Sequence, residues 1–166
     1  MLAYADNLGR AIGARVTMAD AAGIWDSIAW DARRATRELT RIYDQALIPV
    51  ELNIIQFGLL AYLYDARLNG RPLQSIGALA EFTGLSSSAL PRELKSLGAR
   101  GWITSLADAA DRRKRVVSIT TRGCSRLRRA IPFWRGAQTR IRDALGVDNA
   151  VALNGMLDLA SMKLKK

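Results

Sequence analysis

The 166-residue sequence contains no histidine and a single cysteine, Cys124. One thiol cannot form an intramolecular disulfide, which fits a reducing cytosol. The same shortage excludes the usual zinc and iron–sulfur sites, so we expect neither a metal nor a cofactor. No apolar run is long enough to span a bilayer, and the N-terminus lacks the charged-then-apolar order of a signal peptide. These absences predict a cytoplasmic protein without a membrane partner.

The groups that activate an enzyme nucleophile are missing as well. The serines of Ser86–Ser88 have no histidine to act as a base and no lysine in a Ser-x-x-Lys spacing. The glycines of NLGRAIGARV (residues 7–16) match no phosphate-binding loop, and no paired-carboxylate cluster stands out. We interpret Cys124, on an apolar helix seam, as an inert buried thiol. The sequence therefore predicts a protein that is not an enzyme.

Positive charge is abundant and unevenly placed. The chain carries a net charge of +10, and residues 86–129 hold 11 basic and 3 acidic side chains, a net of +8. Residues 1–85 hold 8 basic and 9 acidic side chains. Such a local excess indicates a surface for a polyanion. Charge alone does not show whether the partner is nucleic acid or an anionic membrane. The secondary-structure elements that carry the charge have to distinguish these two partners.

Two long helices are predicted from apolar residues in steps of three and four. One seam runs over residues 25–46 and another over residues 124–145, with Gln138 in its middle. These seams are either intrachain core or a dimer interface, and helices at both ends of the chain favour a homodimer. Gln138 would then set the register or contact a ligand. The residues that we assign to the dimer seam are Trp25, Ile28, Leu39, Ile42, Leu127, Ile131, Ile141 and Leu145.

The middle of the chain has a helix-turn-helix pattern. Asn53 with Gln56 has the form of a capping box, and Ser75 is expected to cap the next helix, which ends at Gly84. A further helix is expected from Ser86 as N-cap, with an apolar stripe at Leu90, Leu94 and Leu97. Its outward face carries Ser87, Ser88, Arg92 and Lys95, which makes it the predicted recognition helix.

A β-hairpin is predicted directly after this helix. The two β-prone runs are residues 102–106 and 116–120, joined by a polar loop. The loop and the start of the returning strand carry Asp111, Arg112, Arg113, Lys114 and Arg115. A solvated turn is the simplest interpretation of such a charge run. Its position behind a helix-turn-helix favours contact with DNA instead, since arginine is attracted to the negative potential of a narrow minor groove.

These elements together resemble the MarR family of bacterial transcription regulators. The resemblance covers residues 26–165 and rests on LNIIQFGLLAYL, LAEFTGLSSSALPRELKSLGARGWI and DAADRRKRVVSITTRG. It implies a mainly α fold with a β-wing and a homodimer held by the terminal helices. It also implies binding of an inverted-repeat operator on double-stranded DNA, usually as a repressor released by a small aromatic or phenolic effector.

The resemblance places Arg113 at the wing tip with Asp111 as the acid that braces it, and it places on the recognition surface Ser87, Ser88, Ala89, Pro91, Arg92 and Lys95. The DNA-binding residues that we assign are Ser86, Ser87, Ser88, Arg92 and Lys95 in the recognition helix and Asp111, Arg112, Arg113, Lys114 and Arg115 in the wing. We expect an N-terminal arm or short helix over residues 1–24 and a single domain over 25–166. Within that domain, residues 25–50 and 121–166 form dimerisation helices, and residues 53–120 form the DNA-binding lobe.

Several features depart from the family pattern or admit a second interpretation. Pro91 is expected to remove a backbone hydrogen bond in the recognition helix and to move its start toward Ser88, and Gly98 weakens the same helix. Arg126 is expected on the exposed start of the last long helix. The aromatic residues Trp30, Phe57, Tyr62 and Trp134 are candidates for an effector pocket, although core packing is the favoured interpretation. The alternative function is a winged-helix protein-interaction or structural module without sequence-specific DNA binding.

Overall fold

The computed structural model describes residues 23, 27–71, 73–86, 88–108, 111 and 114–164. Almost all of the predicted arm over residues 1–24 lies outside this range, as do Trp25, Ser87, Arg112 and Arg113. The chain divides into two compact units, residues 1–39 and 40–166. The long helix α3 (Ile28–Leu47) crosses the boundary between them.

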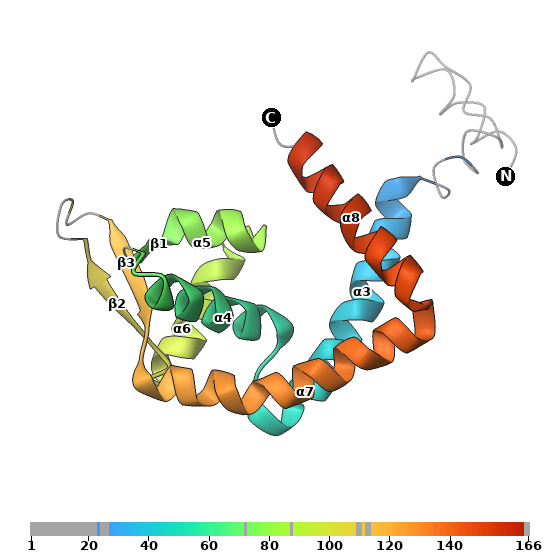
Figure 1. The fold of residues 1–166 in the computed structure, drawn as a ribbon. Coiled ribbons are helices and arrows are strands. Elements are labelled where there is room, and N and C mark those ends of the chain that lie inside the picture. The colour runs from blue at the N-terminus through green and yellow to red at the C-terminus, as the bar shows by residue number, and fades with distance from the viewer. Residues whose placement is uncertain are drawn as a thin grey trace, which may run out of the picture. The chain divides into compact units, whose positions relative to one another are not determined.

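The described chain is mainly helical with one small antiparallel sheet, which confirms the predicted fold class (Figure 1). A 3-10 turn, η1 (Ile48–Val50), and helix α4 (Ile54–Leu68) follow α3. The next elements are β1 (Gln74–Ser75), α5 (Ile76–Thr83), α6 (Ala89–Ala99), β2 (Ile103–Ala107) and β3 (Arg115–Ile119). Helices α7 (Thr121–Leu145) and α8 (Val147–Lys163) come last. We call residues 53–120 the lobe; its order of helices and strands is that of a winged helix-turn-helix.

Side-chain caps begin the helices of the lobe where the sequence predicts them. The Asn53 side chain accepts from the Gln56 amide while the Gln56 side chain accepts from the Asn53 amide, so the capping box is present. The Ser75 side chain accepts from the Ala78 amide at the start of α5, and Gly84 ends that helix with a φ of 64°. These caps satisfy backbone groups that a helix end leaves without partners.

The wing differs from the prediction by one residue at each strand boundary. Strands β2 and β3 pair antiparallel from Ile103 opposite Ile119 to Ala107 opposite Arg115. Trp102 lies before β2 because its amide still bonds to the Leu97 carbonyl and so belongs to the end of α6. Thr120 lies after β3 because its side chain caps α7. The third strand, β1, pairs with β3 and was not predicted, since two residues carry no readable periodicity.

The core lies between the helices of the lobe, the sheet and the first turns of α7. Leu60 of α4, Leu79 of α5, Leu97 of α6 and Val117 of β3 are each no more than 1% exposed. Leu127 of α7 belongs to the same cluster. Figure 1 shows α4, α5 and α6 gathered beside the hairpin, with α7 starting at its base. Helix α6 and the hairpin therefore pack against one shared core.

Among the described residues, no single helix is long and apolar enough to cross a membrane. By length and composition alone, the two consecutive helical segments 28–50 and 54–68 are together long and apolar enough, although a bend of 73° separates them. The second helix of that pair, α4, supplies Leu59, Leu60 and Leu63 to the core of the lobe.

Candidate nucleic-acid interface

Helix α6, the predicted recognition helix, begins at Ala89, two residues later than an N-cap at Ser86 would place it. Ser88 is its N-cap and makes no side-chain capping bond, so the assignment of Ser86 as the N-cap is wrong. Ser86 lies two residues earlier, where its hydroxyl accepts from the Ala89 amide at 3.3 Å and contacts the Ser88 hydroxyl at 3.1 Å. The Leu90 amide donates to the Ser86 carbonyl at 3.3 Å, so residue 91 would donate the next bond of the series, and proline has no amide hydrogen to do so. Pro91 therefore removes one backbone hydrogen bond and the helix starts later, at Ala89, both as predicted.

Helix α6 exposes its polar face and buries its apolar one. Arg92 and Lys95 are exposed, while Leu90 and Leu97 are 1% and 0% exposed. The Arg92 side chain is 80% exposed, and its nearest described carboxylate oxygen, on Glu93, is 3.9 Å away. Both cations on this face are therefore available to an anionic partner. Ser86 and Ser88 are exposed at the N-terminal end of the same helix.

Glu93 anchors the recognition helix to α4. Its carboxylate accepts from the Gln56 amide group at 2.9 Å and from the Asn53 amide group at 3.3 Å. The Gln56 amide group also donates to the Ser96 hydroxyl at 3.4 Å. Gln56 is 8% exposed, so these bonds satisfy a polar side chain inside the lobe. The structural role of Glu93 was not predicted from the sequence. The available signal was that Glu93 is the only acidic residue in a helix whose other charged residues are basic.

The described part of the hairpin tip is held by its own backbone and carboxylates. The Lys114 amide donates to the Asp111 carbonyl at 2.8 Å, and the Asp111 amide donates to the Asp108 carboxylate at 3.3 Å. The Asp111 carboxylate lies 3.9 Å from the Lys114 ammonium, whose side chain is 71% exposed. Since Arg113 lies outside the described residues, the predicted bracing of Arg113 by Asp111 stays a prediction.

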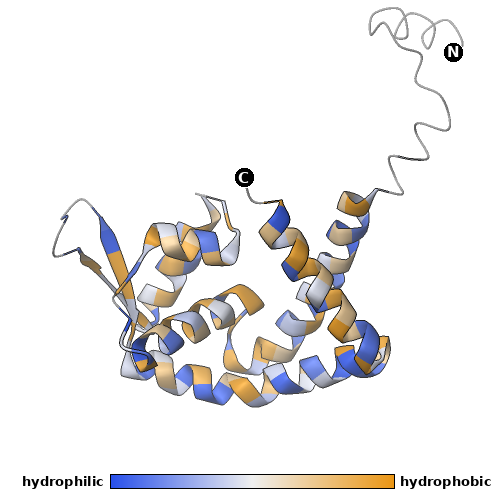
Figure 2. Ribbon diagram, turned by 45° about the horizontal axis from the view of Figure 1, so that its top comes forward, coloured by the Kyte–Doolittle hydropathy of each residue, from blue (hydrophilic) through white to orange (hydrophobic). Residues whose placement is uncertain are grey.

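Arg115 lies along the wing itself. Its guanidinium donates to the Ser105 hydroxyl at 3.0 Å and to the Ser105 carbonyl at 2.9 Å across the two strands. Arg115 is exposed, so one side of the guanidinium remains open to solvent. Figure 2 shows hydrophilic colour at the start of β3, near the tip of the hairpin, and hydrophobic colour deeper in the same strand. The exposed residues Lys114 and Arg115 therefore place positive charge at the tip end of β3.

Arg126 is not the exposed side chain that the sequence indicated. Its side chain is 18% exposed, and the guanidinium donates to the Val50 carbonyl at 3.1 Å and lies 3.4 Å from the Glu51 carboxylate. The expectation of an exposed residue at the start of the last long helix is wrong. Its burial results from the position of η1, which packs beside α7 and supplies the Val50 carbonyl.

The residues assigned to the dimer seam lie in different surroundings. Leu127 is 4% exposed in the core of the lobe, and Ile131 packs against that core, so an intrachain role accounts for both. Ile141 is also buried, at 8%. Leu39 and Ile42 are half-buried, whereas Ile28 is 87% exposed and Leu145 is 39% exposed. Trp25 lies outside the described residues.

Three of the four candidate effector residues, Phe57, Tyr62 and Trp134, pack in or against the core of the lobe. Phe57 and Trp134 stack on each other with ring centroids 5.8 Å apart. Tyr62 stacks on Phe82 at 4.3 Å, and its hydroxyl donates to the Gln74 side chain at 3.1 Å. Trp30 is 38% exposed in the other unit of the chain. These contacts support the interpretation of Phe57, Tyr62 and Trp134 as packing residues.

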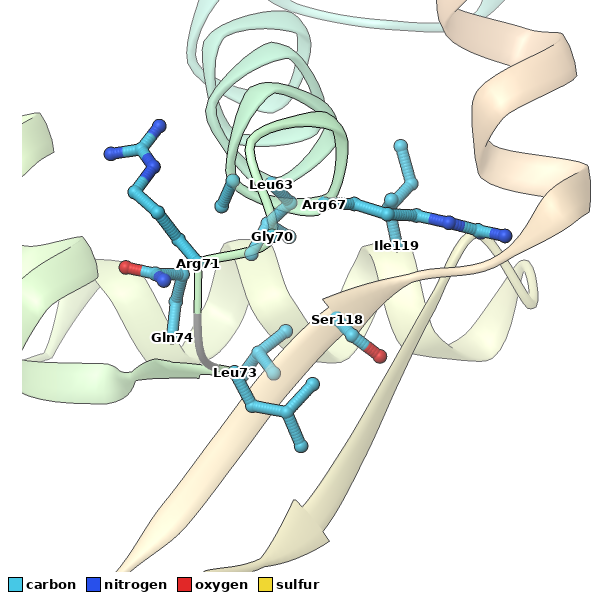
Figure 3. Close-up of a pocket in the computed structure, with 10 residues that line it drawn as sticks. Leu63, Arg67, Gly70, Arg71, Leu73, Gln74, Ser118 and Ile119 are labelled. Carbon is cyan, nitrogen blue, oxygen red and sulfur yellow. The ribbon is translucent and has the colours of Figure 1, made fainter.

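A pocket of about 330 Å³ lies elsewhere in the lobe, between the end of α4, the segment before β1 and strand β3. Figure 3 shows that Arg67 points from α4 toward the start of α7, whereas Arg71 points the opposite way. Arg71 is paired with Asp65 and lies over the Tyr62 ring. The two guanidinium groups thus do not converge on one ligand position, and none of the four candidate effector residues lines this pocket.

Comparisons with known proteins agree with this geometry. A family model described as the MarR family matches residues 51–114. No curated protein matches the sequence significantly. Among solved structures, the transcriptional regulator MosR from M. tuberculosis in complex with DNA is 29% identical, with a TM-score of 0.64, covering 81% of this chain and 97% of that one.

Two further structures show the same fold at lower identity. The transcriptional repressor CouR bound to a 23-mer DNA duplex is 24% identical, with a TM-score of 0.71, covering 83% of this chain and 94% of that chain. BpsR from Bordetella bronchiseptica, whose DNA binding is regulated by 6-hydroxynicotinic acid, is 23% identical with a TM-score of 0.71, covering 82% and 94%. CouR has also been solved bound to p-coumaroyl-CoA. The resemblance to MarR-family regulators is therefore confirmed.

Proposed function

We propose that this chain, whose residues 51–114 match the MarR family, is a homodimeric transcriptional regulator that binds a specific sequence of double-stranded DNA. The observation that carries the proposal is the arrangement of its cations. Arg92 and Lys95 are exposed on the recognition helix, and the wing that follows ends in the basic run of residues 112–115. Residues 86–129, which contain both elements, hold most of the chain's net positive charge.

In the proposed complex, α6 enters the major groove and the wing reaches the adjacent minor groove. Lys95 and Arg92 have the reach and the charge to contact phosphates or base edges, while Ser86 and Ser88 lie at the leading end of the helix and Ser87 stands between them in the sequence. Arg112 and Arg113, which the sequence assigns to the wing tip, carry planar guanidinium groups that are weakly hydrated and suit a narrow minor groove. Asp111, Lys114 and Arg115 shape the wing on either side of them.

The homodimer is supported by apolar surface on the last helix. Exposed large apolar side chains lie along α8, and patches of this kind mark association surfaces. They are Val147, Val151, Met156, Leu157, Leu159 and Met162, with Leu164 just after the helix. Hydrophobic colour on α8 is visible in Figure 2. A second copy of the chain that covers these residues would place two recognition helices about a two-fold axis, which requires an inverted-repeat operator.

The regulatory direction and the effector follow from similarity alone. CouR, which is similar in fold, is a transcriptional repressor, and CouR and BpsR have been studied with aromatic ligands. We therefore include repression and release by a small aromatic effector in the proposal. The experiment is a titration of the protein–DNA complex with p-coumaroyl-CoA and 6-hydroxynicotinic acid as probes. Release of the DNA at ligand concentrations that leave the protein folded supports the effector, and an unchanged affinity with both probes removes it from the proposal.

The test of DNA binding is a selection from a random duplex library followed by an anisotropy titration. We expect an inverted repeat to be enriched and to bind at least about 10³-fold more tightly than random duplex, as specific regulators do. Affinity should fall steeply with salt because phosphate contacts release counterions. Absence of binding at low salt, or binding that is insensitive to salt, would instead favour a protein-interaction module.

A further inference from the structure

The end of the recognition helix is unusually well fixed. Arg100 is the C-cap of α6, and Gly101 has a φ of 68°. The Gly101 amide bonds to the Gly98 carbonyl at 2.9 Å, and the Trp102 amide bonds to the Leu97 carbonyl at 3.0 Å. This pair of bonds is a Schellman motif, which satisfies the last carbonyls of the helix. Trp102 is 2% exposed and immediately precedes β2, so it joins the recognition helix to the wing.

Two arginines from different elements lie over the Trp102 ring. The guanidinium carbon of Arg100 is 4.9 Å from the ring centroid, and that of Arg126, in the second turn of α7, is 4.6 Å away. Both guanidinium groups also bond to the segment before α4. Arg100 donates to the Glu51 carbonyl at 2.8 Å, and Arg126 donates to the Val50 carbonyl at 3.1 Å. One cluster therefore connects η1, the end of α6 and the start of α7.

Glu51 has the backbone conformation that this cluster requires. Its φ is 52°, and among the described residues it is the only residue other than glycine with a positive φ. Its carboxylate Oε2 lies 3.4 Å from Nη2 of Arg126 and 4.0 Å from Nη1 of Arg100. A side chain persists in the left-handed region only where its surroundings hold it there. The Glu51 carbonyl thus accepts from Arg100, and its carboxylate lies near both arginines.

We propose that Glu51 is a positioning residue for DNA binding, an inference that rests on the function proposed above. Glu51 holds Arg100 and Arg126 against Trp102, and the cluster fixes the recognition helix relative to the wing and to α7. Since the helix and the wing reach different grooves, specific affinity depends on their relative placement. The Glu51 side chain is 65% exposed, so its ion pairs are screened by water and add little to overall stability. Glu51 therefore acts on the position of the recognition helix relative to the wing.

The experiment uses the full-length protein with Glu51→Gly. Glycine adopts the required φ without strain, so the variant loses the carboxylate while its backbone conformation becomes easier to hold. We expect about tenfold weaker binding to the duplex selected by the wild type. Binding to random duplex and the slope of log affinity against log salt should stay unchanged, because no phosphate contact is lost. The melting temperature should not fall. Glu51→Gln, which keeps the length of the side chain, should weaken binding in the same direction.

Glu38→Gln is the matched control. Glu38 is also exposed, at 52% of its side chain, and lies 3.6 Å from Arg37, so the substitution makes the same change in net charge outside the cluster. Its affinity for both duplexes should equal that of the wild type. Hydrogen exchange without DNA gives an independent measurement, because amides of residues 97–107 should exchange faster in Glu51→Gly.

Each other outcome is decisive. Unchanged affinity of Glu51→Gly for the selected duplex would overturn the inference and leave the proposed function intact. Equal losses on both duplexes with a shallower salt slope would make the cluster a phosphate contact and overturn positioning. A loss of specific binding without faster exchange in residues 97–107 would also overturn it. A wild type that binds no duplex would refute the proposed function, and the role of Glu51 in DNA binding with it.

Discussion

The hydroxyl of Tyr43 donates a hydrogen bond to Oε1 of Gln138, joining the C-terminal end of α3 to α7 across 95 positions of sequence. Both side chains are half-buried. Gln138 interrupts an apolar seam, and from sequence it was either a register-setting residue or a ligand contact. In the structure it has a partner within its own chain. The bond fixes the end of α3 on α7 and shows how a polar residue is accommodated on that seam.

Tyr43→Phe should remove this link and keep the packing of the ring. The Gln138 oxygen would lose its donor in a half-buried position, which costs about 1 kcal/mol. Burial raises the pKa of Tyr43, and nearby Arg142 lowers it by a smaller amount. The folded state therefore holds the phenolic proton more tightly than the unfolded chain does, and wild-type stability should decline as the pH rises above the ordinary value of 10.

The measurement is urea unfolding of wild type and Tyr43→Phe at neutral pH and above pH 10. The stability advantage of the wild type should be present at neutral pH and should narrow in alkali. Tyr64→Phe is the control, since Tyr64 is also half-buried and its hydroxyl has no hydrogen bond among the described residues. An advantage that stayed constant above pH 10 would show that Tyr43 does not contribute through its proton.

Gly123→Ala should be strongly destabilising. A Cβ at this position would lie 2.1 Å from the Trp102 carbonyl oxygen and 2.8 Å from Cγ1 of Ile119. The Trp102 carbonyl is held by the Thr120 amide at 3.0 Å, so it cannot move without breaking the junction between wing and α7. We expect a loss of about 3 kcal/mol or more, which lowers the melting temperature by roughly 6–12 °C.

Gly136→Ala, in the same helix, provides the contrast. Nothing lies within 4 Å of a Cβ added there, so alanine should stabilise α7 by up to about 1 kcal/mol. Differential scanning calorimetry gives the melting temperatures of the two variants. A loss at Gly123 with a gain at Gly136 would show that the close contact with the Trp102 backbone, and not helix propensity, determines the effect at Gly123. Similar melting temperatures for the two variants would contradict the contact between Gly123 and Trp102.

Local chemistry made much of the lobe predictable. The capping box at Asn53, the cap at Ser75 and the glycine at Gly101 are short-range signals that survive folding unchanged. The N-cap of α6 was misplaced because three consecutive serines offer the same capping chemistry, and Pro91, which has no amide hydrogen, interrupts the bonds that would start the helix at Ser86. Short-range signals identify a helix better than they identify its first residue.

Contacts between distant segments were not predictable in the same way. Nothing in the sequence near Arg126 indicates that η1, 76 positions earlier, supplies a carbonyl for its guanidinium. Glu51 likewise has no local signal for a positive φ, a conformation usually filled by glycine or asparagine. Leu127 fits a dimer seam and an intrachain core equally well, because apolar periodicity shows which face of a helix is covered but not what covers it.

Glu93 should be required for the stability of the lobe. Glu93→Ala removes the acceptor of the Asn53 and Gln56 amide groups and leaves the Gln56 amide with a bond at 3.4 Å to Ser96. Because Gln56 is buried, the expected cost is about 1–3 kcal/mol. Glu93→Gln keeps a carbonyl oxygen in the same place and should cost less. Thermal unfolding of the two variants and of Lys95→Ala, an exposed residue on the same helix, tests this order. Equal stability of Glu93→Ala and Lys95→Ala would contradict it.

Arg113→Ala should weaken DNA binding without destabilising the fold. If Arg113 enters the minor groove, the selected duplex should lose about 1–3 kcal/mol of binding free energy and random duplex should lose less. Arg135→Ala, an exposed arginine in the middle of α7, changes the net charge equally and serves as the control. Anisotropy titrations at one salt concentration give both comparisons. Equal losses on selected and random duplex would make the wing a purely electrostatic contact.

Dimerisation should depend on the apolar residues of α8. Leu157 and Met162 are 47% and 70% exposed, so replacing both with Asp places charges on the proposed interface without opening the core of the lobe. Leu39→Asp with Ile42→Asp tests the other seam, but both residues are half-buried, so that pair should unfold the chain as well as separate it. Asn154→Asp, at an exposed polar position of α8, is the control for added charge.

Sedimentation equilibrium should give a dimer for the wild type and Asn154→Asp, and a folded monomer for the Leu157 and Met162 double variant. Two recognition helices related by a two-fold axis meet half-sites about one helical turn apart, so the selected duplex should be an inverted repeat with that spacing. The monomeric variant should bind a single half-site as weakly as each half of the dimer does alone, and should lose the gain from joining two sites. A monomeric wild type that binds an isolated half-site tightly would contradict both the dimer and the operator symmetry.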